Sequence, residues 1–191
     1  MDVEIKINNI SLETDRIILR PWLLSDLDDF YRYASIPGVG EMAGWKHHES
    51  IEITKKILDS FIEGKNVFAI VYKENNKVIG SLGLHHSWVN EDESCKDLKA
   101  KEIGYVLSKE YWGKGLMPEA VSKVISYCFN NCGLEALTVS HFSFNKQSKR
   151  VIEKCGFKFV KTSKTIAKQL GETYDSLKYI IFNNNLEANS F

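Results

Sequence analysis

The 191-residue sequence predicts a single domain of the α+β class. Apolar runs with strand character alternate along the chain with segments whose apolar residues recur at helical spacing. Two of the expected helices end at a glycine, Gly133 and Gly156, a common way for a helix to stop. No internal repeat or linker interrupts this order, and the chain is long enough to bury a core of its own. We therefore expect one domain over residues 1–183 and a frayed tail over residues 184–191.

The composition argues against several classes of function. The 25 basic and 25 acidic residues cancel, so no overall field favours nucleic acid or an anionic membrane. The start of the chain has no leader-like apolar run, and no segment is apolar for long enough to span a bilayer, so we expect a protein that is neither secreted nor membrane-spanning. Free thiols in a reducing cytoplasm are expected, because the cysteines follow neither zinc-site spacing nor disulfide-scaffold density. They are Cys95, Cys128, Cys132 and Cys155.

The first half of the chain is expected to form two helices and a hairpin after an initial strand. Residues 15–22 (DRIILRPW) predict a strand at a sheet edge, because a proline closes the run. Ser25 is the expected N-cap of the next helix, whose first turns are acidic. Residues 50–64 predict a second amphipathic helix that stops at a glycine. Two apolar runs within residues 66–88, joined by the polar turn ENNK, predict an antiparallel hairpin.

The second half is expected to alternate strands and helices after a polar loop over residues 90–101. Apolar runs predict the strands, and amphipathic periodicity followed by a glycine predicts the helices. The expected elements are a strand over 102–108, a helix from near Pro118 to Gly133, a strand over 136–142, a helix over 145–156, and strands over 157–166 and 176–183.

The stretch EYWGKGLMPEA, residues 110–120, joins a strand to the long helix. Gly113 and Gly115 allow unusual backbone angles and close approach of a ligand, and Pro118 suits a first helical turn. The free amides of that turn and the helix dipole form an anion site. The stretch matches neither the P-loop, because Lys114 is followed by glycine, nor the dinucleotide fingerprint, which needs a third glycine. The residues therefore leave open a phosphate-bearing ligand or a plain strand-to-helix turn.

Two motifs taken together, EIGYVLSKEYWGKGLMPEA and NKQSKRVIEKCGF, resemble the acetyl-CoA-binding motif and the following helix of GNAT-type N-acetyltransferases. Within that superfamily the chain most resembles the ribosomal-protein N-terminal (Rim-type) branch, and the resemblance extends from ETDRIILRPWLLSDL to YIIFN. It implies the GNAT (acyl-CoA N-acyltransferase) fold, a mixed, mainly antiparallel sheet that is splayed near its middle and flanked by helices. It also implies direct transfer of the acetyl group of acetyl-CoA to a primary amine, without a metal.

The family pattern implies which residues contact the cofactor. Main-chain groups of Tyr105, Val106 and Leu107 would pair with the peptide-like pantetheine arm, as an added strand does. The pattern Gln/Arg-x-x-Gly-x-Gly/Ala falls on a run of six residues whose backbone amides would hold the pyrophosphate. These are Trp112, Gly113, Lys114, Gly115, Leu116 and Met117.

Two positions depart from that pattern. Trp112 replaces the Gln/Arg, as is usual in the Rim-type branch, and Met117 replaces the final small residue. Because amides rather than side chains would hold the phosphates, we expect binding to survive, with Met117 pointing away from them. Lys114 either adds a charge contact or is a solvated loop lysine.

The expected helix over residues 145–156 implies further cofactor contacts, and it lacks the tyrosine that many GNAT enzymes use as a general acid. Asn145 and Ser148 match the Asn-x-x-Ser of Rim-type enzymes, in which the asparagine contacts the cofactor and the serine lies near its sulfur. Asn145 would also cap the helix. Many GNAT enzymes protonate the departing thiolate with a tyrosine where this chain has Ile152, so Ser148 or water must act instead. Lys149 and Arg150 either meet the 3′-phosphate or form a solvated helix face.

An ammonium group cannot attack a thioester, so a base or a water chain must first remove its proton. Glu102 heads the strand that would hold the cofactor, where related enzymes often have a glutamate, and is the candidate base; the alternative is an ordinary surface glutamate. His85 and His86 end the preceding strand, and alternation lets only one of them face the cleft. Ordinary polar positions are the alternative for both. The expected catalytic residues are therefore Glu102 and Ser148.

Acceptor specificity is expected in the first two helices and the loop that joins them, residues 35–50, with help from residues 90–99. Trp45, His47 and His48 would shape a small pocket or a groove for a peptide end, unless the loop is mobile and has one anchoring tryptophan. The acceptor is left open between a protein N-terminus, a free amino acid and an amine-bearing antibiotic. Neither nucleic acid nor a membrane is expected as a partner, and a monomer and a homodimer both stay open.

A second class of function stays open beside catalysis. A GNAT-like domain that binds acetyl-CoA, or nothing, would act as a sensor or an assembly module. Ile152 and Met117 favour that alternative. The joint presence of Asn145, Ser148 and Glu102 favours catalysis.

Overall fold

The computed structural model of the chain describes residues 3–93 and 95–183, which form an eight-stranded sheet. The strand order is β1-β2-β3-β4-β5-β6-β8-β7, and every neighbouring pair is antiparallel except β5 and β6, which are parallel. The strands are β1 (Leu12–Glu13), β2 (Ile17–Arg20), β3 (Val67–Tyr72), β4 (Lys77–His86), β5 (Ala100–Leu107), β6 (Ala136–Phe142), β7 (Lys158–Ala167) and β8 (Glu172–Phe182). The helices are α1 (Leu27–Ala34), α2 (Ile51–Gly64), α3 (Leu116–Asn131) and α4 (Lys146–Lys154).

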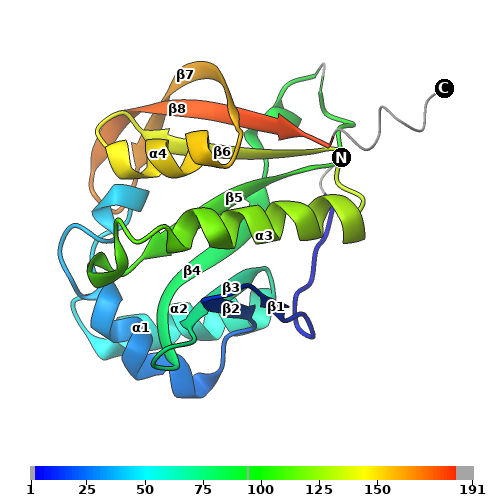
Figure 1. Cartoon of the computed structure of the whole chain (residues 1–191). Coiled ribbons are helices and arrows are strands. Elements are labelled where there is room, and N and C mark those ends of the chain that lie inside the picture. Colours follow the sequence, from blue (N-terminus) through cyan, green and yellow to red (C-terminus); the bar gives the residue numbers. More distant parts are fainter. Residues whose placement is uncertain (1–2, 94, 184–191) are drawn as a thin grey trace.

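Helices cover both faces of this sheet, with α3 in front of the strands in Figure 1 and α2 behind them. The continuous apolar run of β3 explains why, since its successive side chains point to opposite faces. Phe68 and Ile70 pack in the core beneath α3 and α4. Ala69 and Val71 pack in a second core with residues of α1 and α2. The central strands are therefore buried on both sides.

β5 and β6 stay paired over only part of their length. Their parallel register runs from Ala100 opposite Ala136 to Ile103 opposite Val139. Beyond Ile103, β5 continues beside β4 and β6 continues beside β8, so the two strands fan apart, as the left half of Figure 1 shows. The mixed, mainly antiparallel and splayed sheet predicted from the sequence is confirmed.

The predicted helices and strands are present, but two details at the start of the chain differ. Ser25 is not the N-cap of α1, because it lies within a short 3₁₀ turn of residues 24–26. Asp26, which is buried, accepts a hydrogen bond from the Leu23 amide at 2.8 Å and pairs with Arg20 at 2.7 Å. This ion pair holds the turn in place, so the helix begins after Asp26.

The second difference concerns the sheet edge. β2 was expected at the edge, but β1 pairs along its outer side. A strand of two residues is too short to leave a periodic signal in the sequence. The predicted frayed tail, residues 184–191, lies outside the described residues. Within the described ranges, none of the helices has the length and apolar character needed to cross a bilayer.

Candidate functional site

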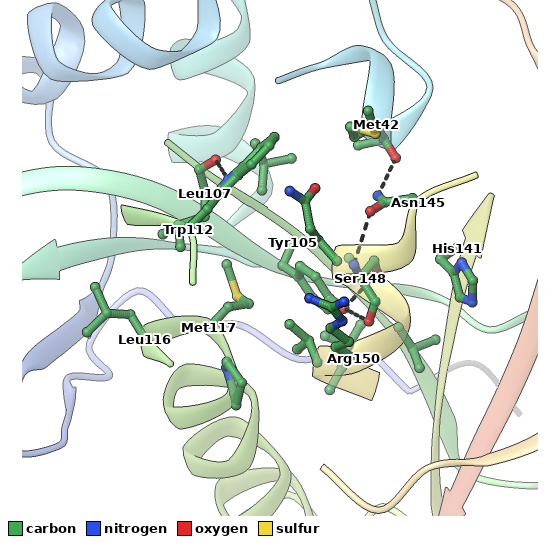
Figure 2. A pocket seen from close by; sticks show the side chains of 18 of the residues that line it. Met42, Tyr105, Leu107, Trp112, Leu116, Met117, His141, Asn145, Ser148 and Arg150 are labelled. Carbon is green, nitrogen blue, oxygen red and sulfur yellow. Dashed lines mark hydrogen bonds between the residues drawn. The ribbon is translucent and has the colours of Figure 1, made fainter. Parts of the chain in front are cut away.

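A cleft of about 430 Å³ opens where β5 and β6 part. Its walls are the end of β5, the segment leading into α3, the start of α4 and the loop between α1 and α2, and Figure 2 shows Tyr105 and Ser148 meeting across it. Lys114 is absent from the lining. The structure brings the other predicted site residues together in this cleft: Glu102, Tyr105, Val106, Leu107, Trp112, Gly113, Gly115, Leu116, Met117, Asn145 and Ser148.

The glycine loop presents bare backbone to the cleft. Gly113 and Gly115 have φ angles of 76° and 77°, in the left-handed region that glycine occupies without strain. α3 begins at Leu116, directly after Gly115. The main-chain amides of residues 113–117 donate no hydrogen bond to any residue that the structure describes. These free donors stand at the positive end of a 16-residue helix, which is the arrangement that binds anions.

A brace from the other end of the chain fixes this loop. Arg16 Nη1 donates to the Lys114 carbonyl at 2.9 Å, and Arg16 Nη2 pairs with Glu119 of α3 at 2.6 Å. The Lys114 ammonium lies 5.0 Å from the centre of the Tyr111 ring, in a cation–π contact. Lys114 thus holds the loop through its backbone, while its side chain packs outside the cleft lining.

The end of β5 forms the long wall of the cleft. Tyr105, Val106 and Leu107 pair with β4 on one side, and on the other side β6 has already departed. The Trp112 indole donates to the Leu107 carbonyl at 2.7 Å (Figure 2), so Trp112 braces the end of the strand. The remaining outward main-chain groups of this segment are available to an extended ligand.

Ser148 and Asn145 form the opposite wall, at the start of α4. The hydroxyls of Ser148 and Tyr105 share a hydrogen bond of 2.8 Å (Figure 2). Burial raises the pKa of Tyr105, so this phenol stays protonated. Asn145 caps α4 by accepting from the Ser148 amide at 3.0 Å, and it donates to the Met42 carbonyl at 3.1 Å. The predicted cap is present, and the same side chain ties the α1–α2 loop to the cleft.

The positions that depart from the family pattern are largely core positions. Ile152 is 1% exposed and packs beneath the helix. Met117 is 5% exposed and also belongs to that core, although it borders the cleft. Of the two cations considered on α4, Arg150 lines the cleft, whereas Lys149 lies 3.7 Å from Glu153 and does not.

Glu102 lies on the opposite face of the sheet from Tyr105. Ser140 donates to its carboxylate at 2.6 Å. Burial raises the pKa of Glu102, against the opposing effects of the Ser140 hydroxyl, the Lys178 charge and the Trp88 amide. A carboxylate with a raised pKa holds its proton more strongly and is a better base near neutral pH than an ordinary one.

His85 is the register partner of Glu102 and lines the cleft, whereas His86 does not. Its ring lies over Gly83 and Gly104, and a side chain at Gly83 would collide with the His85 Nε2 atom, 2.4 Å from the added carbon. Desolvation of the ring, together with the nearby Lys101 charge, lowers the pKa of His85. A neutral imidazole therefore stands at the cleft mouth near neutral pH.

The loop between α1 and α2 contributes residues other than the predicted ones. Val39, Met42 and Ala43 line the cleft, but Trp45, His47 and His48 do not. His47 Nδ1 lies 2.8 Å from a Glu41 oxygen, and His48 Nδ1 lies 2.8 Å from the Thr54 hydroxyl. These aromatic residues hold the loop in place instead of facing a ligand.

Several contacts were missed at the sequence level because they join distant segments. Arg16 and Glu119 are separated by 103 residues, and Tyr105 and Ser148 by 43 residues. Lys154, one turn beyond Arg150, also lines the cleft, and helical spacing could have indicated it. Within the described ranges, no three His, Cys, Asp or Glu side chains are grouped to hold a metal ion.

Residues 16–158 match the acetyltransferase (GNAT) domain family, which is most of the chain. The chain belongs to the GNAT acetyltransferase family. The uncharacterized N-acetyltransferase YoaA of Bacillus subtilis (strain 168) is 30% identical over 175 residues, which cover 89% of this chain and 95% of YoaA. The resemblance to GNAT enzymes is thereby confirmed, and acetyl-CoA-dependent N-acetylation is general to this family.

Solved GNAT structures share the fold. The ribosomal-protein-S5-alanine acetyltransferase from Vibrio fischeri superposes with a TM-score of 0.72 at 23% identity, covering 93% of this chain and 98% of that one. The microcin C7 self immunity acetyltransferase MccE, in complex with acetyl-CoA and AMP, superposes with a TM-score of 0.71 at 21% identity, covering 88% and 93%.

Proposed function

We propose that this protein transfers the acetyl group of acetyl-CoA to a primary amine by direct attack of the amine on the thioester. The observation that supports the proposal best is the arrangement of the cleft. Free amides stand at one end, an open strand edge runs along its length, and Glu102 and Ser148 stand on opposite faces of the opening. Such a cleft can hold a long thioester and admit an amine from the far side.

The cleft residues fit the parts of acetyl-CoA. The amides of residues 113–117 would hold the pyrophosphate, since free N–H groups at a helix start are strong anion donors. The open edge of Tyr105–Leu107 would pair with the amides of the pantetheine arm. Arg150 and Lys154 supply positive charge on the α4 side for the 3′-phosphate.

Glu102 would act as the base. Acetyl-CoA supplies the acetyl thioester: the C–N bond forms, the C–S bond breaks, and coenzyme A leaves as a thiolate that takes up a proton from water. Glu102 removes a proton from the acceptor's ammonium group, and a positioned base of this kind contributes ~10²–10⁴-fold to a rate. Ser140 fixes the carboxylate, and burial raises its pKa toward the range in which it can exchange protons near neutral pH.

Ser148 would stabilise the departing sulfur, with Tyr105 in support. When the Tyr105 hydroxyl donates to Ser148 Oγ, the serine proton is free to face the cleft. The raised pKa of Tyr105 makes it a poor source of a proton for a thiolate, whose own pKa is about 8.5. The Tyr105–Ser148 pair would therefore stabilise the thiolate through a hydrogen bond from Ser148. It would not protonate the thiolate, as a tyrosine in place of Ile152 would.

The first test is continuous measurement of thiol release from acetyl-CoA with a panel of amines: peptides with different N-termini, amino acids, polyamines and aminoglycosides. Acceleration by one class supports the proposal and identifies a protein N-terminus or a small amine as acceptor. Acetyl-CoA binding without turnover across the panel favours the sensor or assembly module.

Substitution of Glu102 by glutamine tests the assigned base. We expect turnover to fall ~10²-fold or more while acetyl-CoA affinity is retained. In the wild type, activity should rise with pH as Glu102, whose pKa is raised, loses its proton, and this rise should disappear in the variant. Glu63→Gln, on an exposed part of α2, is the matched control and is expected to behave as the wild type. Wild-type turnover in Glu102→Gln at every pH would remove Glu102 from the mechanism.

A further inference from the structure

A second pocket, of about 370 Å³, lies outside the main cleft. Its lining comes from β7, β8 and the segment that follows β4: Trp88, Glu91, Asp92, Lys161, Ser163, Lys164 and Lys178. No residue of this pocket appears in the lining of the main cleft. It is thus a separate feature that the proposed transfer reaction does not yet use.

Two lysines share one aromatic surface in this pocket. The ammonium groups of Lys161 and Lys178 lie 5.1 Å and 5.5 Å from the centre of the Trp88 ring. The two lysines are also register partners across β7 and β8, an arrangement that like charges destabilise. A bulge between Phe159 and Lys161 creates it, because unbroken register would place Val160 opposite Lys178.

Neither ammonium forms an ion pair with a residue that the structure describes. By contrast, the adjacent Lys164 is paired with Asp175 at 2.8 Å. Lys161 and Lys178 therefore concentrate positive charge where an anion would relieve their repulsion.

Two residues that line the pocket also carry buried donors without an acceptor among the described residues. Trp88 is 9% exposed, and its indole N–H is buried without a hydrogen-bond partner among the described residues. The Ser163 hydroxyl is likewise buried and unpartnered there. Buried donors are nearly always satisfied in native proteins, and both of these belong to residues that line the pocket, so an acceptor oxygen bound there would satisfy them.

The acidic residues of the lining limit what that ligand can be. Because Lys164 is already paired with Asp175, Glu91 and Asp92 balance the charges of Lys161 and Lys178 in the lining. A phosphate dianion or a polyanion would face both carboxylates. A single carboxylate meets less repulsion from Glu91 and Asp92 than those anions and matches the set of N–H and O–H donors.

The pocket adjoins the proposed base. Lys178 is the register partner of Ser140, whose hydroxyl donates to Glu102. The Trp88 amide and the Lys178 charge both act on the Glu102 carboxylate. We propose that the pocket of Trp88, Lys161 and Lys178 binds a carboxylate of the acceptor, so that the preferred substrates are amines that bear a carboxylate close by. The proposal rests on the transferase function above.

Matched acceptor pairs test the proposal. The first pair is a free amino acid and its amide, which tests an α-carboxylate. The second pair is a peptide with glutamate at its second position and the same peptide with glutamine there, which tests a side-chain carboxylate. We expect the wild type to favour the carboxylate member of at least one pair by about tenfold or more in kcat/KM. The ratio within a pair cancels any effect of Lys178 on Glu102.

The variants locate the preference. Lys161→Met with Lys178→Met retains the apolar stems and is expected to abolish the preference, whereas Lys164→Met, whose partner is Asp175, is the control and is expected to keep it. The proposal is overturned if the wild type shows no preference in either pair, or if the double variant keeps it.

A binding measurement distinguishes failure of this proposal from failure of the transferase function. N-acetylalanine, titrated into the protein, is expected to shift the NMR signal of the Trp88 indole N–H, identified by its loss in Trp88→Phe. The shift should vanish in the double lysine variant and be absent with N-acetylalanine amide. If the shift is seen without thiol release, the carboxylate site stands and the transferase function fails. If the signal does not move, the carboxylate site is refuted whatever the activity.

Discussion

Replacement of Gly115 by aspartate is expected to abolish binding of acetyl-CoA while leaving the protein folded. The glycine has a φ of 77°, and a carbon added to it would meet only Arg16 Nη2, at 3.6 Å, which is an ordinary contact. The left-handed backbone costs a non-glycine residue ~1–2 kcal/mol, and aspartate tolerates it better than most. The new carboxylate, however, would stand among the free amides of residues 113–117, where it competes for them and repels a pyrophosphate.

The magnitude follows from the donors lost. A hydrogen bond to a charged group is worth ~1.5–3 kcal/mol, so the loss of two amide contacts weakens binding by ~3–6 kcal/mol. At ~1.4 kcal/mol per factor of ten, the dissociation constant rises ~10²–10⁴-fold. The loss of stability lowers Tm by ~2–4 °C for each kcal/mol in a chain of this size.

Calorimetric titration with acetyl-CoA and thermal unfolding measure the two effects separately. Gly171→Asp is the matched control, because Gly171 has a φ of 69°, lies in the turn between β7 and β8 and has open space where a side chain would extend. It is expected to lose similar stability and keep wild-type affinity. Folded Gly115→Asp protein with wild-type affinity, or an equal loss in Gly171→Asp, would refute the assignment of the phosphate site.

Two further predictions concern the supporting contacts. Tyr105→Phe is expected to lower kcat about 2–12-fold, the worth of one neutral hydrogen bond, with little change in acetyl-CoA affinity. Because Tyr105 acts through Ser148, the double variant with Ser148→Ala should be no slower than Ser148→Ala alone; additive losses in steady-state kinetics would contradict this. Hydrogen bonds from His47 and the Gly38 amide outweigh burial and lower the pKa of Glu41 to about 2 from an ordinary 4.5. A lowered carboxyl pKa stabilises the fold above the unfolded value and loses that effect as pH falls, so stability should decline from about pH 4.5 to about 2. In Glu41→Gln this decline in stability should be smaller by ~1–2 kcal/mol, a value that allows for the partial exposure of the Glu41 carboxylate. Urea unfolding at several pH values measures the decline, and an unchanged decline in the variant would show that Glu41 is not its source.

The sequence by itself determined the local features of this protein. Apolar periodicity placed the helices and strands, as in α2 and β6, because a buried stripe or face repeats with the geometry of its own element. It also located the glycine loop before α3 and the cap at Asn145, since backbone angles and caps depend on a few adjacent residues. Apart from Lys114, the predicted site residues therefore lie at the cleft: Glu102, Tyr105, Val106, Leu107, Trp112, Gly113, Gly115, Leu116, Met117, Asn145 and Ser148.

Only the tertiary structure decided which distant residues meet. The parting of β5 from β6 depends on strand pairing, which no single segment encodes. The Tyr105–Ser148 pair and the Arg16–Glu119 brace each join segments far apart in the chain. The bulge that aligns Lys161 with Lys178 reverses the sheet face that each later side chain of β7 occupies. Reading the alternation of apolar and polar residues in the sequence does not reveal one extra residue in a strand. Contacts of this kind form only when the whole sheet closes, because their free energy comes from surfaces buried between elements rather than within them.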